Sequence, residues 1–273
     1  MTSTSAELTT PRGDLARQIT VATSAVLAVI GAFVGSGAAG GTPVQDASGG
    51  ALAADATLLA PGGGAFSIWS VIYVGLVAYA VWQFLPAQRA AQRQRRLGYL
   101  VAASLVLNAA WILAIQFDQL ALSVPIIVAL LVVLILAFRI CRATRPADRV
   151  DAVLTDGTIG LYLGWVSVAT AANITAVLVA AGFDGWGLAP EAWAIGVLAA
   201  VGVIGVCLAI WDGGRIAPTL SLAWGLSWIA VARLTDAPPS TPTAVAAITA
   251  AAAIVIATVW SRLATMRAPS ASD

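Results

Sequence analysis

Residues 157–181 read GTIGLYLGWVSVATAANITAVLVAA and contain no charged side chain. At about 1.5 Å per residue, a helix of about 25 residues crosses a hydrocarbon layer about 30 Å thick, so this stretch predicts a membrane-spanning helix. Tyr162, Trp165, Ala169 and Asn173 recur at offsets of three and four, which places them on one face of that helix. A polar group that faces hydrocarbon without a partner costs several kcal/mol. We therefore expect this face to line the interior of a helical bundle or a pocket.

The composition extends this expectation to the whole chain. Hydrophobic residues make up 60% of the 273 residues and charged residues only 10%, whereas soluble domains average roughly 45–50% apolar and about 25% charged. The predicted fold class is therefore an all-α polytopic membrane protein. A net charge of +1 gives no electrostatic basis for binding nucleic acid. The sequence contains no His, which excludes imidazole metal ligands and His-based acid–base catalysis, and we expect no metal site.

Eight apolar runs are separated by polar segments or by segments rich in Pro and Gly. Cytoplasmic loops of membrane proteins collect Arg and Lys. With the N-terminus inside, every basic residue except Arg233 falls in a cytoplasmic segment. We therefore predict eight helices with both chain ends in the cytoplasm, in the plasma (inner) membrane that is the default for a helical bundle. The seventh run is short for a span and would need flanking turns. The runs are residues 19–37, 65–85, 97–116, 120–138, 157–181, 193–211, 219–232 and 244–260.

These runs divide the chain into four parts. We predict a polar cytoplasmic N-terminus over residues 1–18, a five-helix unit over 19–182, a three-helix transmembrane extension over 183–262 and a cytoplasmic tail over 263–273. A cleaved signal peptide is the alternative interpretation of the first run, and the length of that run favours an uncleaved span.

Polar and aromatic side chains occur at helical spacing in two further runs. Trp69 and Tyr73 are four residues apart in the second run, and Asn108 and Trp111 are three apart in the third. Counting about 1.5 Å per residue from each helix start, these side chains converge with those of the fifth run beneath the predicted external loop 42–64. An aromatic-lined pocket is the commonest form of small-molecule site, and the loop would act as its lid.

Structural roles compete with a binding role for several residues. Asn108 and Asn173 are also suited to interhelical hydrogen bonds that only hold a bundle together. Gly160 and Gly164 form a G-x-x-x-G pattern that predicts close helix packing. Asp156 begins the fifth run, where we expect a helix N-cap rather than a proton carrier.

The motifs of these three runs resemble those of the TspO/MBR family, the tryptophan-rich sensory proteins that include the mitochondrial translocator protein (peripheral benzodiazepine receptor). The resemblance covers about residues 15–182, which is the five-helix unit of the family. Leu161 stands where the family usually has Pro, and three helices are added after the unit. In chain order the matching segments are Pro61 with Phe66-x-x-Trp69-x-x-x-Tyr73, then Asn108-x-x-Trp111, then Tyr162-Leu-x-Trp165-x-x-x-Ala169-x-x-x-Asn173.

The resemblance implies a five-helix bundle whose cavity, covered by the first loop, binds a tetrapyrrole such as protoporphyrin IX or a haem-like molecule, and in some members sterols. It also implies an apolar small-molecule ligand rather than a resident cofactor, and a homodimer as a further expectation. Carried over residue by residue, the implied ligand-binding side chains are Trp69, Tyr73, Asn108, Trp111, Tyr162, Trp165, Ala169 and Asn173.

Three classes of function remain open. The first is a TspO-like sensory membrane protein that binds a porphyrin or another apolar ligand. The second is a carrier of apolar metabolites or lipids, which the three additional helices suggest. The third, an integral membrane enzyme acting on porphyrin or lipid, is least favoured, because the span interiors lack Asp, Glu, Arg and Lys and offer no general acid or base. We accordingly predict no catalytic residue.

Overall fold

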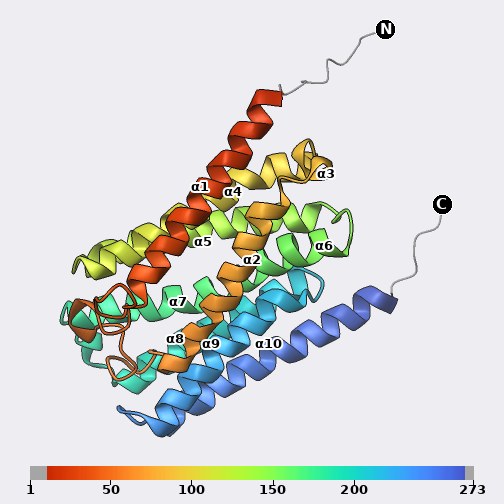
Figure 1. The fold of residues 1–273 in the computed structure, drawn as a ribbon. Coiled ribbons are helices and arrows are strands. Elements are labelled where there is room, and N and C mark those ends of the chain that lie inside the picture. The colour runs from red at the N-terminus through yellow and green to blue at the C-terminus, as the bar shows by residue number, and fades with distance from the viewer. Residues whose placement is uncertain (1–10, 268–273) are drawn as a thin grey trace.

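The computed structural model describes residues 11–267 and contains eight long helices and two short ones in that range (Figure 1). The eight long helices coincide with the eight predicted runs. The long helices are α1 (Pro11–Gly35), α2 (Ile68–Trp82), α4 (Gln92–Gln116), α5 (Leu120–Ala143), α7 (Thr158–Ala180), α8 (Pro190–Trp211), α9 (Ile216–Thr235) and α10 (Thr241–Arg267); the short ones are α3 (Pro86–Arg89) and α6 (Arg149–Asp151).

Seven of the long helices are long and apolar enough to cross a membrane, and α9 is the exception. Its 20 residues span about 30 Å, so α9 is longer than the predicted run 219–232, and its polarity rather than its length sets it apart. The side chains responsible are buried in the protein, among them Thr219, Ser221 and Arg233. A helix with polar side chains is stable inside a membrane when those side chains are buried against other parts of the protein, as they are here.

The first helix begins earlier than predicted, because polar residues before the apolar run have buried partners. Arg17 donates to the side chain of Gln83 (3.1 Å) and to the carbonyl of Arg89 (3.0 Å). Gln18 donates to the carbonyl of Gln83 (2.6 Å). Helix α1 therefore includes residues 11–18, and α10 likewise extends through residues 263–267. The rest of the two predicted cytoplasmic ends, residues 1–10 and 268–273, lies outside the described residues.

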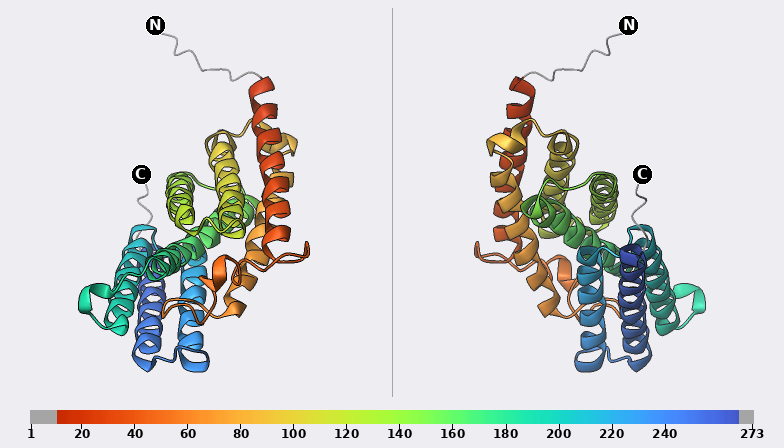
Figure 2. Two further views of the ribbon diagram at one scale, coloured as in Figure 1. Left: turned by 90° about the vertical axis from the view of Figure 1, so that its left-hand side faces the viewer. Right: turned by 90° about the vertical axis from the view of Figure 1, so that its right-hand side faces the viewer.

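Helix α7 lies between two groups of helices (Figure 2). On one side α5 packs on α7, α4 on α5, and α1 on α4, while α2 contacts both α1 and α7. On the other side α9 packs on α7, and α10 packs between α9 and α8. The stretch that best predicted a membrane span is thus the element shared by both groups.

The buried hydrophobic residues form two clusters. One draws on α1, α2, α4, α5 and the first half of α7. The other draws on α8, α9 and α10, with Leu59 of the loop and Val168 of α7. The division of the chain into residues 19–182 and 183–262 stays a prediction.

The predicted close packing at Gly160 and Gly164 is confirmed, and the partner is α9. A Cβ added at Gly160 would lie 2.9 Å from that of Ala217, and one at Gly164 would overlap the carbonyl oxygen of Pro218 and the hydroxyl of Ser221. Glycine is therefore required for this approach of two backbones.

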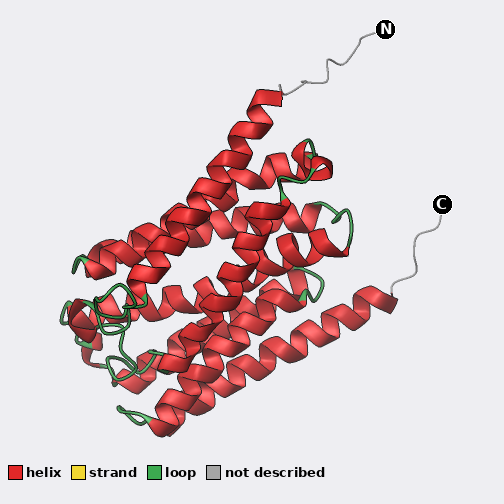
Figure 3. Cartoon of the chain, in the orientation of Figure 1, coloured by secondary structure: helices red, strands yellow, loops and turns green. Residues whose placement is uncertain are grey.

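The two ends of the bundle differ in charge. Helix α1 begins and α10 ends at one end, where α3 and α6 also lie, whereas the loop 36–62 lies at the opposite end (Figures 1 and 3). Arg93 and Arg215 belong to the first end, and Arg233 contacts the loop at the other. This distribution of Arg between the two ends agrees with the predicted alternation of Arg-rich and Arg-poor segments along the chain. Which end faces the cytoplasm stays a prediction.

The expectation that Asp156 caps a helix is wrong. The chain is helical from α6 through a π-helical segment, Ala152–Gly157, into α7, so residue 156 has no free helix start to cap. Its carboxylate instead pairs with Arg93 of α4 and, at 3.1 Å, with Arg215 of the turn between α8 and α9. The ion pairs join both helix groups at the Arg-rich end.

Candidate ligand-binding cavity

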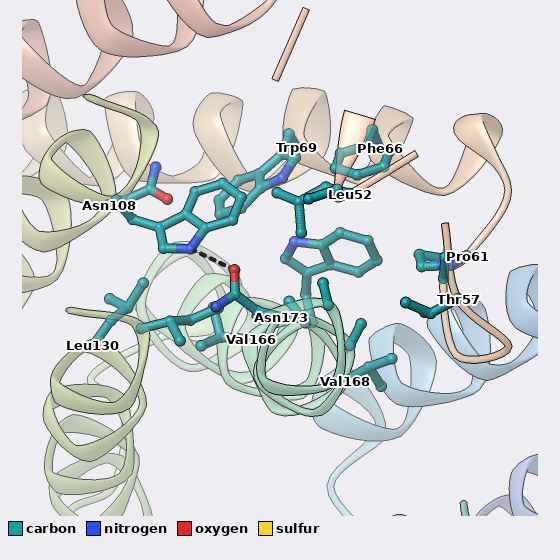
Figure 4. Close-up of a pocket in the computed structure, with 18 residues that line it drawn as sticks. Leu52, Thr57, Pro61, Phe66, Trp69, Asn108, Leu130, Val166, Val168 and Asn173 are labelled. Atoms are coloured by element: carbon teal, nitrogen blue, oxygen red, sulfur yellow. Dashed lines mark hydrogen bonds between the residues drawn. The ribbon is translucent and has the colours of Figure 1, made fainter. Parts of the chain in front are cut away.

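An aromatic cluster joins α2 to α7. A 3₁₀ turn, Gly63–Ser67, leads into α2 and directs Phe66 and Trp69 toward α7 (Figure 4). The ring centroid of Trp69 lies 6.2 Å from that of Trp165 and 5.6 Å from that of Tyr162, with interplanar angles of 83° and 73°. Phe66 meets Trp165 edge to face as well, at 6.0 Å. Aromatic pairs prefer this geometry, so the motif residues of two distant segments form one packed group.

Asn173 joins three helices through hydrogen bonds. Its side-chain oxygen accepts from the Trp111 indole (3.2 Å; dashed in Figure 4), and its amide nitrogen donates to the Ser123 hydroxyl (2.8 Å). Trp111 belongs to α4 and Ser123 to α5. These are the interhelical hydrogen bonds that the structural role of Asn173 predicts.

Three buried polar atoms nearby have no hydrogen-bond partner among the described residues. Asn108 donates to the Tyr73 hydroxyl through its amide nitrogen, but its side-chain oxygen is unpaired. The indole nitrogen of Trp165 and the hydroxyl of Thr57 are also unpaired. An unsatisfied buried group typically costs about 1–3 kcal/mol. These three atoms are therefore free to form a hydrogen bond with a further molecule.

All three atoms belong to residues that line one cavity of about 50 Å³. The loop covers it with Leu52, Thr57 and Pro61, while α2, α4, α5 and α7 form its sides (Figure 4). Sites for drug-sized ligands are about 300–1,000 Å³, so the cavity in this structure is too small for a ligand of that size. The lining consists of Ala51, Leu52, Thr57, Ala60, Pro61, Phe66, Trp69, Asn108, Trp111, Ile127, Leu130, Trp165, Val166, Val168, Ala169, Ala172, Asn173 and Ala176.

The structure brings the predicted site residues together, but not all of them reach the cavity. Tyr73 and Tyr162 are held behind it: Tyr73 accepts from Asn108, and Tyr162 donates to the carbonyl of Ser104 (3.3 Å). The six predicted residues that line the cavity are Trp69, Asn108, Trp111, Trp165, Ala169 and Asn173.

Several lining residues were missed in the sequence. Phe66 stands within the F-x-x-W motif, which could have identified it. Thr57 lies in a loop with no periodicity, so no sequence signal marks it. Leu130 and Val166 are apolar residues of apolar helices, where a pocket-lining residue looks like any other.

Helix α9 holds the covering loop in place. Arg233, only 1% exposed, donates to the carbonyl of Ala54 in the loop and to that of Pro238 (2.8 Å) after its own helix. The Trp224 indole donates to the carbonyl of Ala65 (3.0 Å). The predicted three-helix extension thus contacts the loop that covers the cavity. The sequence did not reveal this role for Arg233.

A close backbone contact strengthens this attachment. The amide of Gly62 donates to the carbonyl of Trp228 (3.1 Å). A Cβ added at Gly62 would lie 3.1 Å from the Trp228 ring, and one at Gly64 would overlap that ring. Glycines at these two positions let the chain lie flat against α9 before it enters α2.

Fold and cavity together define a polytopic helical membrane protein with a small, aromatic-lined cavity under a loop. Comparison with protein families is more specific: the chain belongs to the TSPO-like protein family, whose profile matches residues 21–260. This confirms the family resemblance and carries it from α1 into α10, past the residues 15–182 that the motifs cover. Comparisons with curated proteins and with solved structures find no match.

Proposed function

We propose that this protein is a TspO-like sensory membrane protein that binds a planar apolar ligand, of which a porphyrin is the leading candidate, in the aromatic cavity under the loop 42–64. The observation that carries the proposal is the set of unpaired atoms in the cavity: one donor at Trp165, one acceptor at Asn108 and one hydroxyl at Thr57. Protoporphyrin IX has carboxylic groups at its edge, which accept hydrogen bonds as carboxylates and donate when protonated, and a flat apolar face.

The aromatic walls support the same class of ligand. Trp69, Trp111 and Trp165 line the cavity from three different helices. Aromatic rings favour stacked or edge-on contact with a flat conjugated ligand. In this proposal Trp165 and Asn108 orient the polar edge of the ligand, and the other two indoles contact its face.

Binding in this proposal requires the cavity to open. A volume of about 50 Å³ cannot hold a tetrapyrrole. The lining segment that is not part of a long helix is the loop around Leu52, Thr57 and Pro61. We therefore assign the loop the part of a lid that moves away from α7 when ligand enters, in the way that lids open other sites.

The test is a titration of the purified protein with protoporphyrin IX, followed by the absorption shift of the porphyrin, comparing wild type with Trp165→Phe. The variant keeps an aromatic ring but removes the unpaired N–H donor. Loss of one hydrogen bond of about 0.5–1.5 kcal/mol predicts a dissociation constant raised about two- to thirteenfold.

Trp260→Phe is the matched control for this titration. Trp260 is 65% exposed on α10 and does not line the cavity, so the same substitution there should leave porphyrin affinity unchanged. Equal affinity in all three proteins, or no saturable binding by wild type, would show that the motifs preserve a fold and not this site.

A carrier of apolar metabolites or lipids is the second candidate, and one observation favours it. Thr57 lines both the aromatic cavity and a larger apolar groove on the far side of α7, so the two spaces meet at the loop. Ligand flux across vesicles containing the protein distinguishes the candidates, since a receptor binds porphyrin without moving it across the bilayer.

A further inference from the structure

A second and larger space lies between α8 and the face formed by α5 and α7. It has a volume of about 1,470 Å³ and is lined along the length of α8, from Trp193 to Trp211. It exists because α8 packs mainly on α10, which stands between α8 and α9 (Figure 2). We call this space the α8 groove. The α7 residues that line it differ from those that line the aromatic cavity, and the two spaces share only Thr57 of the loop.

The walls of the α8 groove offer hydrocarbon contact and few free polar groups. Ile135, Leu178 and Ile204 present large apolar side chains to it. The hydroxyls on the α7 wall are occupied within their own helix: Thr170 donates to the carbonyl of Val166 (2.7 Å) and Thr175 to that of Ala171 (2.9 Å). Ser167 donates to Leu163 in the same way (2.8 Å). An apolar space of this size inside a membrane is filled by hydrocarbon rather than by water.

One end of the α8 groove is positively charged. Arg139 of α5 lines the groove and is exposed, and it forms no ion pair among the described residues. One turn further along, the guanidinium of Arg142 lies 4.3 Å from the centroid of the Trp211 ring, which also lines the groove. Tryptophan at this depth is typical of the headgroup region of a membrane.

The carboxylates at this end are already engaged elsewhere. Asp156 pairs with Arg93 and Arg215, and Asp151 pairs with Arg93. Asp212 accepts from the backbone amides of Gly214 and Arg215 (2.9 and 3.0 Å). The charge of Arg139 is therefore available to an anion that comes from the bilayer.

We propose that the α8 groove binds one anionic phospholipid from the leaflet at the Arg-rich end. Its phosphate lies at Arg139, its glycerol region lies beside Trp211, and its acyl chains run between α7 and α8 past Ile204. The lipid fills the gap between α8 and α5 and so completes the packing of the three-helix extension. This proposal does not depend on the ligand proposed for the aromatic cavity.

The experiment is native mass spectrometry of the full-length protein released from vesicles that contain phosphatidylglycerol and phosphatidylcholine in equal amounts. We expect one retained phospholipid per chain. We also expect phosphatidylglycerol to be preferred about fivefold or more, the factor expected for one Arg beside an anionic headgroup. Equal retention of the two lipids, or retention of none, would overturn the proposal.

Two matched pairs of variants locate the site. Ile204 and Val203 are adjacent on α8 and 64% and 63% exposed, but only Ile204 lines the groove. Ile204→Trp should displace the lipid while Val203→Trp keeps it. Arg139→Gln should remove the preference for phosphatidylglycerol, whereas Arg145→Gln, which removes an exposed charge outside the groove in the segment after α5, should not.

Either pair behaving alike would contradict the assignment. A lipid-free dimer in place of a lipid-bound monomer would also overturn it, because a second copy would then occupy the groove. Loss of porphyrin binding has no bearing on these outcomes, since the retained lipid is weighed without porphyrin present.

Discussion

The two intramembrane asparagines show how one residue type takes different parts in the same bundle. Both oxygen and nitrogen of the Asn173 side chain are paired, with Trp111 and Ser123, whereas the Asn108 oxygen is unpaired and lines the cavity. The sequence left both roles open for both residues. The role that each asparagine takes depends on its hydrogen-bond partners, and these partners belong to other helices.

We predict that Asn173→Ala lowers the stability of the bundle. The substitution removes the partner of the Trp111 indole and one partner of the Ser123 hydroxyl in a site where water has little access, at a cost of about 1–2 kcal/mol. Thermal unfolding in detergent measures the effect as a lower midpoint.

Thr175→Ala serves as the control for this comparison. The Thr175 hydroxyl donates to the carbonyl of Ala171 in its own helix, so its removal leaves no other side chain unpaired. A midpoint shift as large for Thr175→Ala as for Asn173→Ala would mean that the interhelical hydrogen bonds contribute nothing specific.

At the scale of helices, the arrangement of the cavity depends most on the contact between α7 and α9. Gly160 and Gly164 let α9 approach α7 on the face opposite the α4 and α5 contacts. Through that contact α9 is positioned to hold the loop at Trp224, Trp228 and Arg233.

We predict that Gly164→Leu separates α9 from α7 and destabilises the protein by several kcal/mol, because the new side chain would overlap the backbone of Pro218. Low yield of folded protein and a lower thermal midpoint are the expected readouts. Gly196→Leu on α8 is the control, since nothing lies within 4 Å of a Cβ added there. Similar losses in both variants would show that any leucine in these helices is harmful, independent of the contact.

Hydropathy and periodicity predicted the elements well, but not their ends. All eight apolar runs became helices, because a backbone in hydrocarbon must satisfy its own hydrogen bonds. Helix α1 starts before its run because Arg17 finds partners directly after α2, on α3 and on α4. The cap expected at Asp156 became an ion pair for a similar reason, since Arg93 and Arg215 reach it from other parts of the chain.

For the molecule as a whole, residues far apart in sequence act on one loop. The loop covers the cavity, and it is held by residues of α9. Arg233 of α9 lies about 180 residues later in the chain than its partner Ala54 in the loop. Helix α9 therefore acts on the loop that covers the cavity without lining the cavity itself. In the proposed function, the strength of these anchors sets how easily the lid opens.

We predict that Arg233→Gln loosens the lid while the bundle stays folded. The shorter side chain cannot reach the carbonyls of Ala54, Ala237 and Pro238 together. Amide hydrogen exchange in the loop should then rise about tenfold, which corresponds to about 1.4 kcal/mol of lost local stability. Exchange in the interior of α4 should not change.

Arg262→Gln is the control for the lid. Arg262 donates to the carbonyl of Gly214 (3.4 Å) in the turn after α8, at the opposite end of the bundle from the loop, so its loss should leave exchange in the loop as in wild type. If Arg233→Gln leaves loop exchange unchanged, α9 does not restrain the lid.

The sequence by itself determined the chain's environment, its helices and the family to which it belongs. These follow from local properties: uninterrupted apolar length, helical spacing and short motifs such as Tyr162-Leu-x-Trp165. The tertiary structure alone decided which polar atoms are satisfied, that the cavity is small, that α9 holds the loop at Arg233 and that a groove opens beside α8. Each of these depends on distances between helices that are remote in sequence, and a hydropathy pattern records which residues avoid water but not which neighbours they meet.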